Sequence, residues 1–446
     1  MTTTIRELAA GLAAGRLTSV ALTHEMLARA EAHRAEGGHA YVSLDGEQAL
    51  REARASDALR AAGVVASPLA GIPVSIKDLF DMRGQVSSAA SLALADSAPA
   101  TGDADAVARL RAAGAVLLGR TNMSEFAFSG LGLNPHHGTP RNPHDATRVA
   151  GGSTSGGAVT VALDMAAGAL GTDTGGSIRI PSAFCGLTGF KPTAATVSLA
   201  GTVPLSRSLD SAGPIANSVD CCAILHAALS GQEHALPAPS LKGLRFGHTP
   251  DFVGAGVEQQ VQQAFDAALD RLRAAGALVQ PFDFPELLQL PAINGGGGLV
   301  AAEAWHWHRE LLAARGAQYD QRVAARIRRG QQQGAAEYID LLDARAHLRL
   351  IAHKRLAPYD AWLMPSVAIV APEVAPLEAD DTAFFATNGL VLRNASVINF
   401  LDGCALSLPC HAAGALPVGL GICGLAGSDA RILSIGRAVE ALLRER

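Results

Sequence analysis

The sequence is organised around the stretch Gly-Thr-Asp-Thr-Gly-Gly-Ser-Ile-Arg-Ile-Pro at Gly171–Pro181 and a second stretch upstream, Gly-Gly-Ser-Thr-Ser-Gly-Gly at Gly151–Gly157. Each contains a Gly-Gly-Ser unit, and the two serines, Ser153 and Ser177, lie 24 residues apart with a helix-like apolar run between them. Glycine and serine are common in turns for backbone reasons, so two tight turns are the simplest interpretation. A glycine-rich loop before a helix also binds anions, so a non-catalytic anion or nucleotide site is a second interpretation.

A lysine follows a short strand pattern further upstream. Apolar residues alternate from Ile72 to Ile76, which predicts a strand, and Lys77 comes directly after it. A serine nucleophile needs a group that takes its proton, and that group has to be neutral near pH 7. The pKa of a free lysine is about 10.4, but burial lowers the pKa of a lysine by several units. A serine hydroxyl accepts one proton and donates another, so Lys77, Ser153 and Ser177 form a candidate relay.

The rest of the chain alternates between helical and strand patterns, and no low-complexity linker divides it. The hexapeptide Leu-Arg-Ala-Ala-Gly-Ala occurs at Leu110–Ala115 and again at Leu272–Ala277, each time between a helical pattern and an apolar strand pattern. Glycine is the usual residue just beyond the C-terminus of a helix, so both copies predict a connection from a helix to a strand. These patterns together predict one compact α/β domain.

The composition excludes several classes of protein. Of the 446 residues, 49% are hydrophobic and 17% charged, and the formal net charge is −5. A disordered chain is less hydrophobic and more highly charged, and a protein that binds nucleic acid through a basic field is more basic, so we expect no nucleic-acid partner. The absence of an 18-residue apolar run and of an export signal predicts a cytoplasmic protein without membrane contact. The six cysteines form no Cys-x-x-Cys pair and are expected to be buried thiols.

These stretches resemble the amidase signature family. The similar blocks are Gly71–Asp78, Thr121–Ala127, Gly138–Pro143, the signature itself from Gly151 to Thr193, Leu205–Pro214 and Leu416–Leu420. The resemblance covers nearly the whole chain. It implies a single α/β domain at 1–446, with a large mixed, twisted sheet surrounded by many α-helices. Within it we expect a helical segment at 1–65, the signature core with the catalytic residues at 66–220, and the remainder of the domain at 221–446.

The resemblance also implies a role for individual residues. Ser177 is the expected nucleophile, Lys77 the base, and Ser153 the bridging serine, with a cis peptide bond between Gly152 and Ser153. Ser155 is the rival for the bridge, because the loop reads Ser-Thr-Ser here. Backbone N–H groups from Thr174 to Ser177, and so Thr174, Gly175 and Gly176, are expected to form the oxyanion hole, and Ala127 to line the acyl pocket. No metal and no cofactor is implied.

The expected activity is hydrolysis of a carbon–nitrogen bond in a small amide, carbamate or ureido compound. The alternative within the family is the glutaminase subunit of a tRNA-dependent amidotransferase. A homodimer is a further possibility that the sequence leaves open. Substrate-selecting residues are expected outside the signature; candidates for the rim are Gly295–Gly298, Trp305, Trp307, Asn394 and Asn399. The basic run Arg322, Arg326, Arg328 and Arg329 is interpreted as a solvated helix face.

Overall fold

The computed structural model describes residues 3–232 and 236–445. Within these residues, eleven strands form one mixed sheet in the order β1-β3-β2-β6-β8-β7-β12-β13-β11-β9-β10, and β4 and β5 form a separate ribbon. The strands are β1 (Tyr41–Leu44), β2 (Pro73–Lys77), β3 (Val116–Thr121), β4 (Arg141–Asn142), β5 (Asp145–Val149), β6 (Gly168–Thr172), β7 (Thr188–Lys191), β8 (Ala212–Ala216), β9 (Arg245–His248), β10 (Leu278–Pro281), β11 (Ala361–Pro365), β12 (Cys404–Pro409) and β13 (Gly419–Gly424).

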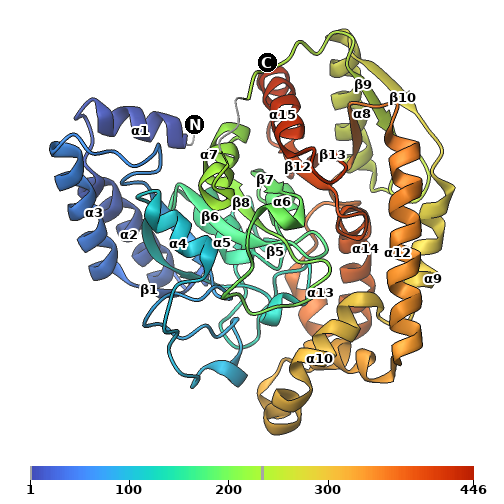
Figure 1. The fold of residues 1–446 in the computed structure, drawn as a ribbon, viewed down its shortest axis with the longest axis horizontal. Helices are drawn as coiled ribbons and strands as arrows, with labels where there is room; N and C mark the ends of the chain where they lie inside the picture. Colours follow the sequence, from blue (N-terminus) through green and yellow to red (C-terminus); the bar gives the residue numbers. More distant parts are fainter. Residues whose placement is uncertain (1–2, 233–235, 446) are drawn as a thin grey trace.

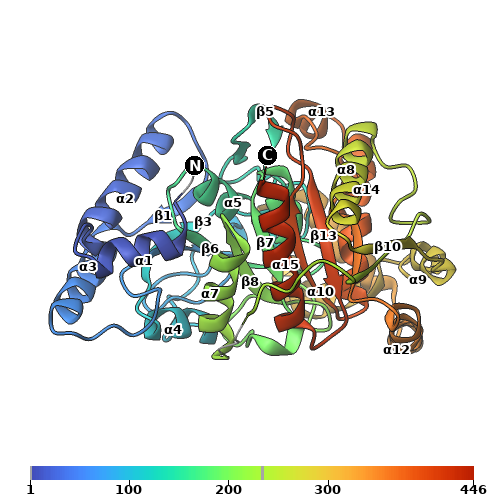
Figure 2. The same ribbon diagram turned by 90° about the horizontal axis from the view of Figure 1, so that it is seen from above.

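Helices surround this sheet along its whole length (Figures 1 and 2). They are α1 (Ile5–Ala13), α2 (Ser19–Ala35), α3 (Gly46–Ala61), α4 (Asp105–Ala112), α5 (Ser155–Ala162), α6 (Arg179–Phe184), α7 (Val219–Ser230), α8 (Gln259–Ala274), α9 (Leu290–Ile293), α10 (Gly298–Arg315), α11 (Gln321–Arg328), α12 (Ala335–Leu356), α13 (Val374–Ala379), α14 (Asp381–Phe400) and α15 (Asp429–Arg444). The helices α1–α3 lie at one end of the molecule, and α9 and α12 lie at the other (Figure 1). The predicted fold, a single domain with a large mixed sheet among many helices, is confirmed.

The strand that ends at Lys77 lies inside the sheet. β2 pairs in parallel with β3 on one side and with β6 on the other, and all five of its residues are buried. Because parallel neighbours run in the same direction, their C-terminal ends meet at one edge of the sheet. This arrangement brings Lys77, the last residue of β2, next to Thr172, the last residue of β6.

The two copies of the repeated hexapeptide both connect a helix to a strand, as predicted. Gly114 follows α4 and Gly276 follows α8, with φ of +83° and +87°, and β3 and β10 begin two residues later. The helix-like run between Ser153 and Ser177 contains α5, which begins at Ser155. The helices around the basic run, α10, α11 and α12, are separated by short 3₁₀ turns.

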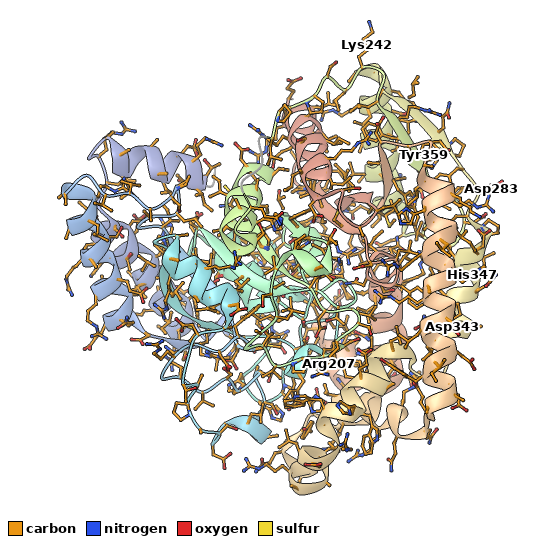
Figure 3. The ribbon with its side chains drawn as sticks, in the orientation of Figure 1. Arg207, Lys242, Asp283, Asp343, His347 and Tyr359 are labelled. Atoms are coloured by element: carbon orange, nitrogen blue, oxygen red, sulfur yellow. The ribbon has the colours of Figure 1, made fainter. Side chains whose placement is uncertain are left out.

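The long helix α12 covers one side of the C-terminal part. Leu341 and Leu348 are buried on its inner side, whereas Asp343 and His347 are exposed and point away from the molecule (Figure 3). The cysteines are free thiols, and all but the half-buried Cys410 are buried. No helix in the described residues is long and apolar enough to cross a membrane. The cytoplasmic location and the three segment boundaries remain predictions.

Candidate active site

Lys77 is completely buried and its ammonium nitrogen contacts two hydroxyl groups. Lys77 Nζ lies 2.7 Å from Ser153 Oγ and 2.8 Å from Thr172 Oγ1, and it donates a hydrogen bond to each. Burial lowers the pKa of Lys77 to about 7, although the nearby charges of Asp173 and Asp210 act in the opposite direction. Burial disfavours the charged form of an amine, so Lys77 loses its proton more readily than an exposed lysine does. The structure therefore provides a buried amine that can accept a proton from a hydroxyl group.

Ser153 is held in place by the backbone around it. The peptide bond between Gly152 and Ser153 is cis, as the resemblance implied. The N–H of Ser124 donates to the carbonyl of Ser153 (3.2 Å), and the N–H of Gly152 donates to the carbonyl of Gly130 (2.8 Å). A Cβ atom on Gly152 would lie only 2.5 Å from the nitrogen of Gly132, so no larger residue fits there.

The rival bridge, Ser155, does not contact the lysine. Its hydroxyl is buried at the start of α5 and has no hydrogen-bond partner among the described residues. Of the two candidate bridges, Ser153 is the one whose hydroxyl lies within hydrogen-bond distance of Lys77.

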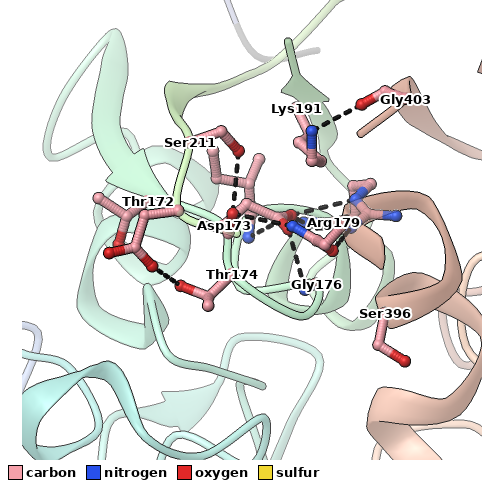
Figure 4. Close-up of polar contacts among 12 residues, drawn as sticks. Thr172, Asp173, Thr174, Gly176, Arg179, Lys191, Ser211, Ser396 and Gly403 are labelled. Atoms are coloured by element: carbon pink, nitrogen blue, oxygen red, sulfur yellow. Dashed lines mark hydrogen bonds and ion pairs between the residues drawn. The ribbon is translucent and has the colours of Figure 1, made fainter. Parts of the chain in front are cut away.

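The loop before α6 carries Ser177 and is organised by the carboxylate of Asp173 (Figure 4). This carboxylate accepts hydrogen bonds from the N–H groups of Gly176 (2.9 Å) and Ile178 (3.1 Å). It also forms a buried ion pair with Arg179 at 2.9 Å. Burial alone would raise the pKa of Asp173, but the charge and hydrogen bonds of Arg179 hold it well below its usual range. The loop thus keeps a fixed shape around an ionised carboxylate.

Ser177 itself is 3% exposed and lies beside the Ser153 loop, because its carbonyl accepts from the N–H of Thr154 (3.3 Å). In the described part of the chain, the N–H groups of Thr174, Gly175 and Ser177 have no acceptor. The N–H of Gly176 is engaged by Asp173. Three of the four backbone donors expected for an oxyanion are therefore available.

The remaining contacts of this loop explain its glycines. Gly176 has φ of +124°, and a Cβ atom there would lie 2.5 Å from that of Ala395 on α14. The hydroxyl of Thr174 donates to Asp210 at 2.5 Å (Figure 4). Burial raises the pKa of Asp210 to about 6, even though the hydrogen bond from Thr174 lowers it. Backbone and side-chain contacts thus fix the loop from both sides.

Ala127 ends a short 3₁₀ turn, Glu125–Ala127, and is buried with φ of +59°. The buried carboxylate of Glu125 fixes this turn, since it accepts from Ser91 (2.6 Å) and from the N–H of Asp320 (2.8 Å). The next residue, Phe128, lines the cavity described below. The sequence analysis did not single out Glu125, Thr172 or Asp173, because their roles depend on contacts with other elements.

A cavity of about 410 Å³ adjoins the loop of Ser177. Thr174 and Gly175 form one wall, and the other walls come from Phe128, which follows the 3₁₀ turn, and from segments in and around α9, α10, α11 and α14. Lining residues include Phe128, Leu209, Phe252, Asn294, Gly297, Arg326, Arg329, Leu392, Arg393 and Ser396. Ser396 lies on α14 opposite Gly176 (Figure 4).

Several of the expected rim residues lie elsewhere. Within the loop Gly295–Gly298, Gly297 lines the cavity. Asn394 is buried and donates to the carbonyls of Val253 and Pro365. Asn399 is buried as well and donates to Asp173. Neither asparagine lines the cavity, because both point into the protein as hydrogen-bond donors.

The interpretation of the basic run as a solvated face is wrong for part of that run. Arg326 points inward, where it donates to the carbonyl of Phe128 and lies 4.3 Å from the centre of the Phe128 ring. Arg322 bonds to Asp381 and to the carbonyl of Leu377. Only Arg328 and Arg329 are exposed. The sequence pattern missed this because α11 is a short helix that packs on α10 rather than part of a long exposed helix.

Comparison with known proteins supports a hydrolase of carbon–nitrogen bonds. Residues 21–433 match the amidase family, so the chain belongs to that family, the amidase signature enzymes. It is 35% identical to the 2-amino-5-chloromuconic acid deaminase of Comamonas testosteroni, over 98% of this chain and 96% of that protein. It is 34% identical to one of the subunits of the glutamyl-tRNA(Gln) amidotransferase of Roseiflexus sp. (strain RS-1), again over 98% and 96%. The crystal structure of an amidase superposes with a TM-score of 0.90 at 35% identity, over 98% of this chain and 99% of that one.

Proposed function

We propose that the protein hydrolyses a small amide-type substrate through an acyl-enzyme on Ser177, with Lys77 as the base and Ser153 as the proton relay. The observation that carries the proposal is the pair of hydrogen bonds from the buried Lys77 to the hydroxyls of Ser153 and Thr172. A buried amine with a pKa of about 7 is a suitable base near neutral pH. Membership of the amidase family supports a carbon–nitrogen bond as the target.

The first half of the reaction forms the acyl-enzyme. Ser177 Oγ attacks the carbonyl carbon, its proton passes to Ser153, and Ser153 gives its own proton to Lys77. Negative charge develops on the carbonyl oxygen, where the N–H groups of Thr174, Gly175 and Ser177 stabilise it. The carbon–nitrogen bond then breaks, and the proton returns from Lys77 through Ser153 to the leaving nitrogen.

The second half repeats this relay with water. Water attacks the acyl carbon of Ser177, its proton moves through Ser153 to Lys77, and the ester bond to Ser177 Oγ breaks. The proton then returns to Ser177 Oγ, which releases the acid and restores the enzyme. Thr172 does not carry a proton in this scheme; it accepts the second hydrogen bond of Lys77 and fixes the direction of the amine.

The direct test is covalent trapping of the nucleophile. A fluorophosphonate or sulfonyl fluoride is expected to modify Ser177, which peptide mass spectrometry locates, and Ser177→Ala is expected to be inactive toward amides. Modification of another residue instead, or full activity in Ser177→Ala, contradicts the proposal.

A second candidate function is the glutaminase subunit of a tRNA-dependent amidotransferase, since the relatives of this chain include subunits of glutamyl-tRNA(Gln) amidotransferases. The same residues would act, but activity would depend on partner subunits. Purification of the protein together with its native binding partners distinguishes the independent amidase from the amidotransferase subunit. Glutamine hydrolysis that appears only with a co-purified subunit favours the amidotransferase. The protein alone is expected to be sufficient. The homodimer and the cytoplasmic location remain predictions.

A further inference from the structure

Three arginines line the cavity beside the Ser177 loop. Arg326 and Arg329 approach it from the end of α11, and Arg393 approaches it from α14. The three side chains come from different elements but line one cavity, at whose wall Thr174 and Gly175 also lie. The positive charge therefore adjoins the position at which a substrate carbonyl would be bound.

These arginines lack acidic partners. None of the three forms an ion pair with any residue in the described ranges, and the residues that line the cavity include no aspartate or glutamate. Arg326 bonds to the carbonyl of Phe128, and Arg329 to the carbonyl of Gly295 (2.7 Å). Neither contact neutralises the charge.

Arg393 has unused hydrogen-bonding capacity. Its Nε donates to Asn394 Oδ1 at 3.0 Å, whereas one terminal nitrogen is buried without a hydrogen-bond partner among the described residues. A buried donor that lacks an acceptor is costly, and a carboxylate is the group that a guanidinium binds best. Burial, followed by the nearby charge of Arg329, also lowers the pKa of Arg326 to about 10. An anion bound between Arg326 and Arg329 would relieve the repulsion between their positive charges.

We propose that this cavity binds a carboxylate of the substrate, so that the preferred substrate is an amide-type compound with a free acid group and without an ammonium group. The inference rests on the proposed function for the identity of the bond that is cleaved, but not for the binding of the acid. A zwitterion such as glutamine fits less well, because its ammonium group would add positive charge to a cavity lined by arginines without an acidic residue.

The test compares matched ligands on the full-length Ser177→Ala variant, which binds without turnover. Calorimetry measures the Kd of succinamate, glutaramate and adipamate against butanamide, pentanamide and hexanamide, which have the same chain lengths without the acid. At least one acid is expected to bind about tenfold or more tightly than its neutral counterpart, as is typical of a charged hydrogen-bonded pair. Glutamine is expected to bind more weakly than glutaramate, which differs from it only by the amino group.

Substitution of the arginines locates the effect. In the Ser177→Ala background, Arg393→Met is expected to reduce the preference for the acid by about tenfold. Arg328→Met is the matched control, since Arg328 lies on α11 close to Arg326 but is exposed and does not line the cavity. Because Arg326 also packs on Phe128, it is tested as Arg326→Lys, which retains the charge and is expected to retain part of the preference.

Several results would overturn the inference: no detectable binding of any of the acids, equal or tighter binding of every neutral amide, tighter binding of glutamine than of glutaramate, or an unchanged preference in Arg393→Met. Hydrolysis by the wild-type enzyme tests the proposed function separately. Suppose that Ser177→Ala binds the acids selectively, but the wild type hydrolyses none of these amides and is not trapped at Ser177. This result contradicts the proposed hydrolysis and supports the carboxylate-binding cavity. If Ser177 is trapped but no acid is preferred, the proposed hydrolysis is supported and the carboxylate-binding cavity is contradicted.

Discussion

Two buried lysines end two strands of the same sheet and differ in the atoms that they contact. Lys77 ends β2 and donates to the hydroxyls of Ser153 and Thr172. Lys191 ends β7 and donates to the carbonyls of Pro192 (2.7 Å) and Gly403 (2.6 Å). Burial lowers the pKa of both, to about 7 for Lys77 and about 8 for Lys191.

The comparison shows that a lowered pKa does not by itself make a base. A hydroxyl can give its proton to a neutral amine, whereas a carbonyl oxygen only accepts hydrogen bonds. Lys191 therefore has no proton to collect from its partners, and it connects β7 to the start of β12 through the carbonyl of Gly403. We infer that Lys77 performs chemistry and that Lys191 stabilises the fold.

The largest effect on kcat is expected from single substitutions of the two lysines by methionine, which should differ in their consequences. Lys77→Met removes the base, and kcat for amide hydrolysis should fall by about 10³-fold, which is a typical contribution of a general base. Lys191→Met leaves two buried carbonyls without a donor, so the free energy of unfolding should fall by about 2–4 kcal/mol. Its kcat, measured at a temperature at which the variant is folded, should stay within about tenfold of the wild type.

Urea unfolding monitored by circular dichroism provides the control for folding in both variants. The comparison fails if Lys191→Met loses as much kcat as Lys77→Met while it remains folded.

The second effect separates the two candidate bridges. Ser153→Ala interrupts the proton path, and kcat should fall by about 10²-fold or more. Ser155→Ala is a matched control two residues away, because the Ser155 hydroxyl is buried without a partner among the described residues. Removal of an unpaired hydroxyl costs little, so kcat should change by no more than about twofold. Steady-state kinetics of both variants decides the assignment; a larger loss in Ser155→Ala would transfer the relay to that residue.

The third effect is a shift in pH dependence. Lys77 has to be neutral to accept a proton, so kcat/KM should rise with pH through about pH 7, where its ammonium deprotonates. Thr172→Val removes an acceptor that stabilises the ammonium, which should move this acid limb to lower pH. Lys191→Met should leave the limb in place. A limb that does not respond to Thr172→Val would indicate that another group titrates.

The fold could largely be predicted from the sequence, since local patterns indicate several of its helices and strands and the resemblance implies its large mixed sheet. The alternation at Ile72–Ile76 identified β2, and the glycines after α4 and α8 identified the connections to β3 and β10. The resemblance supplied the cis peptide at Ser153, which local patterns do not encode.

The parts that escaped prediction depend on how distant segments pack. Thr172 contacts Lys77 because β2 and β6 are parallel neighbours, and strand order is not visible in a single sequence. The sequence pattern places Arg326 on a solvated helix face, whereas its helix is short and the side chain packs on Phe128. Asn399 acts through Asp173, more than two hundred residues away. Such contacts are set by tertiary structure rather than by spacing.

The most direct test of the central claim is the titration of Lys77 itself. The chain contains four lysines, Lys77, Lys191, Lys242 and Lys354. Protein labelled with ¹³C and ¹⁵N only in lysine therefore gives four side-chain signals by NMR, and single substitutions assign them. We expect the signal that is missing from Lys77→Met to titrate near pH 7. Modification of Ser177 by a sulfonyl fluoride is expected to perturb this signal more than the signal of Lys191. A Lys77 signal that remains fully protonated up to pH 9 would contradict the account.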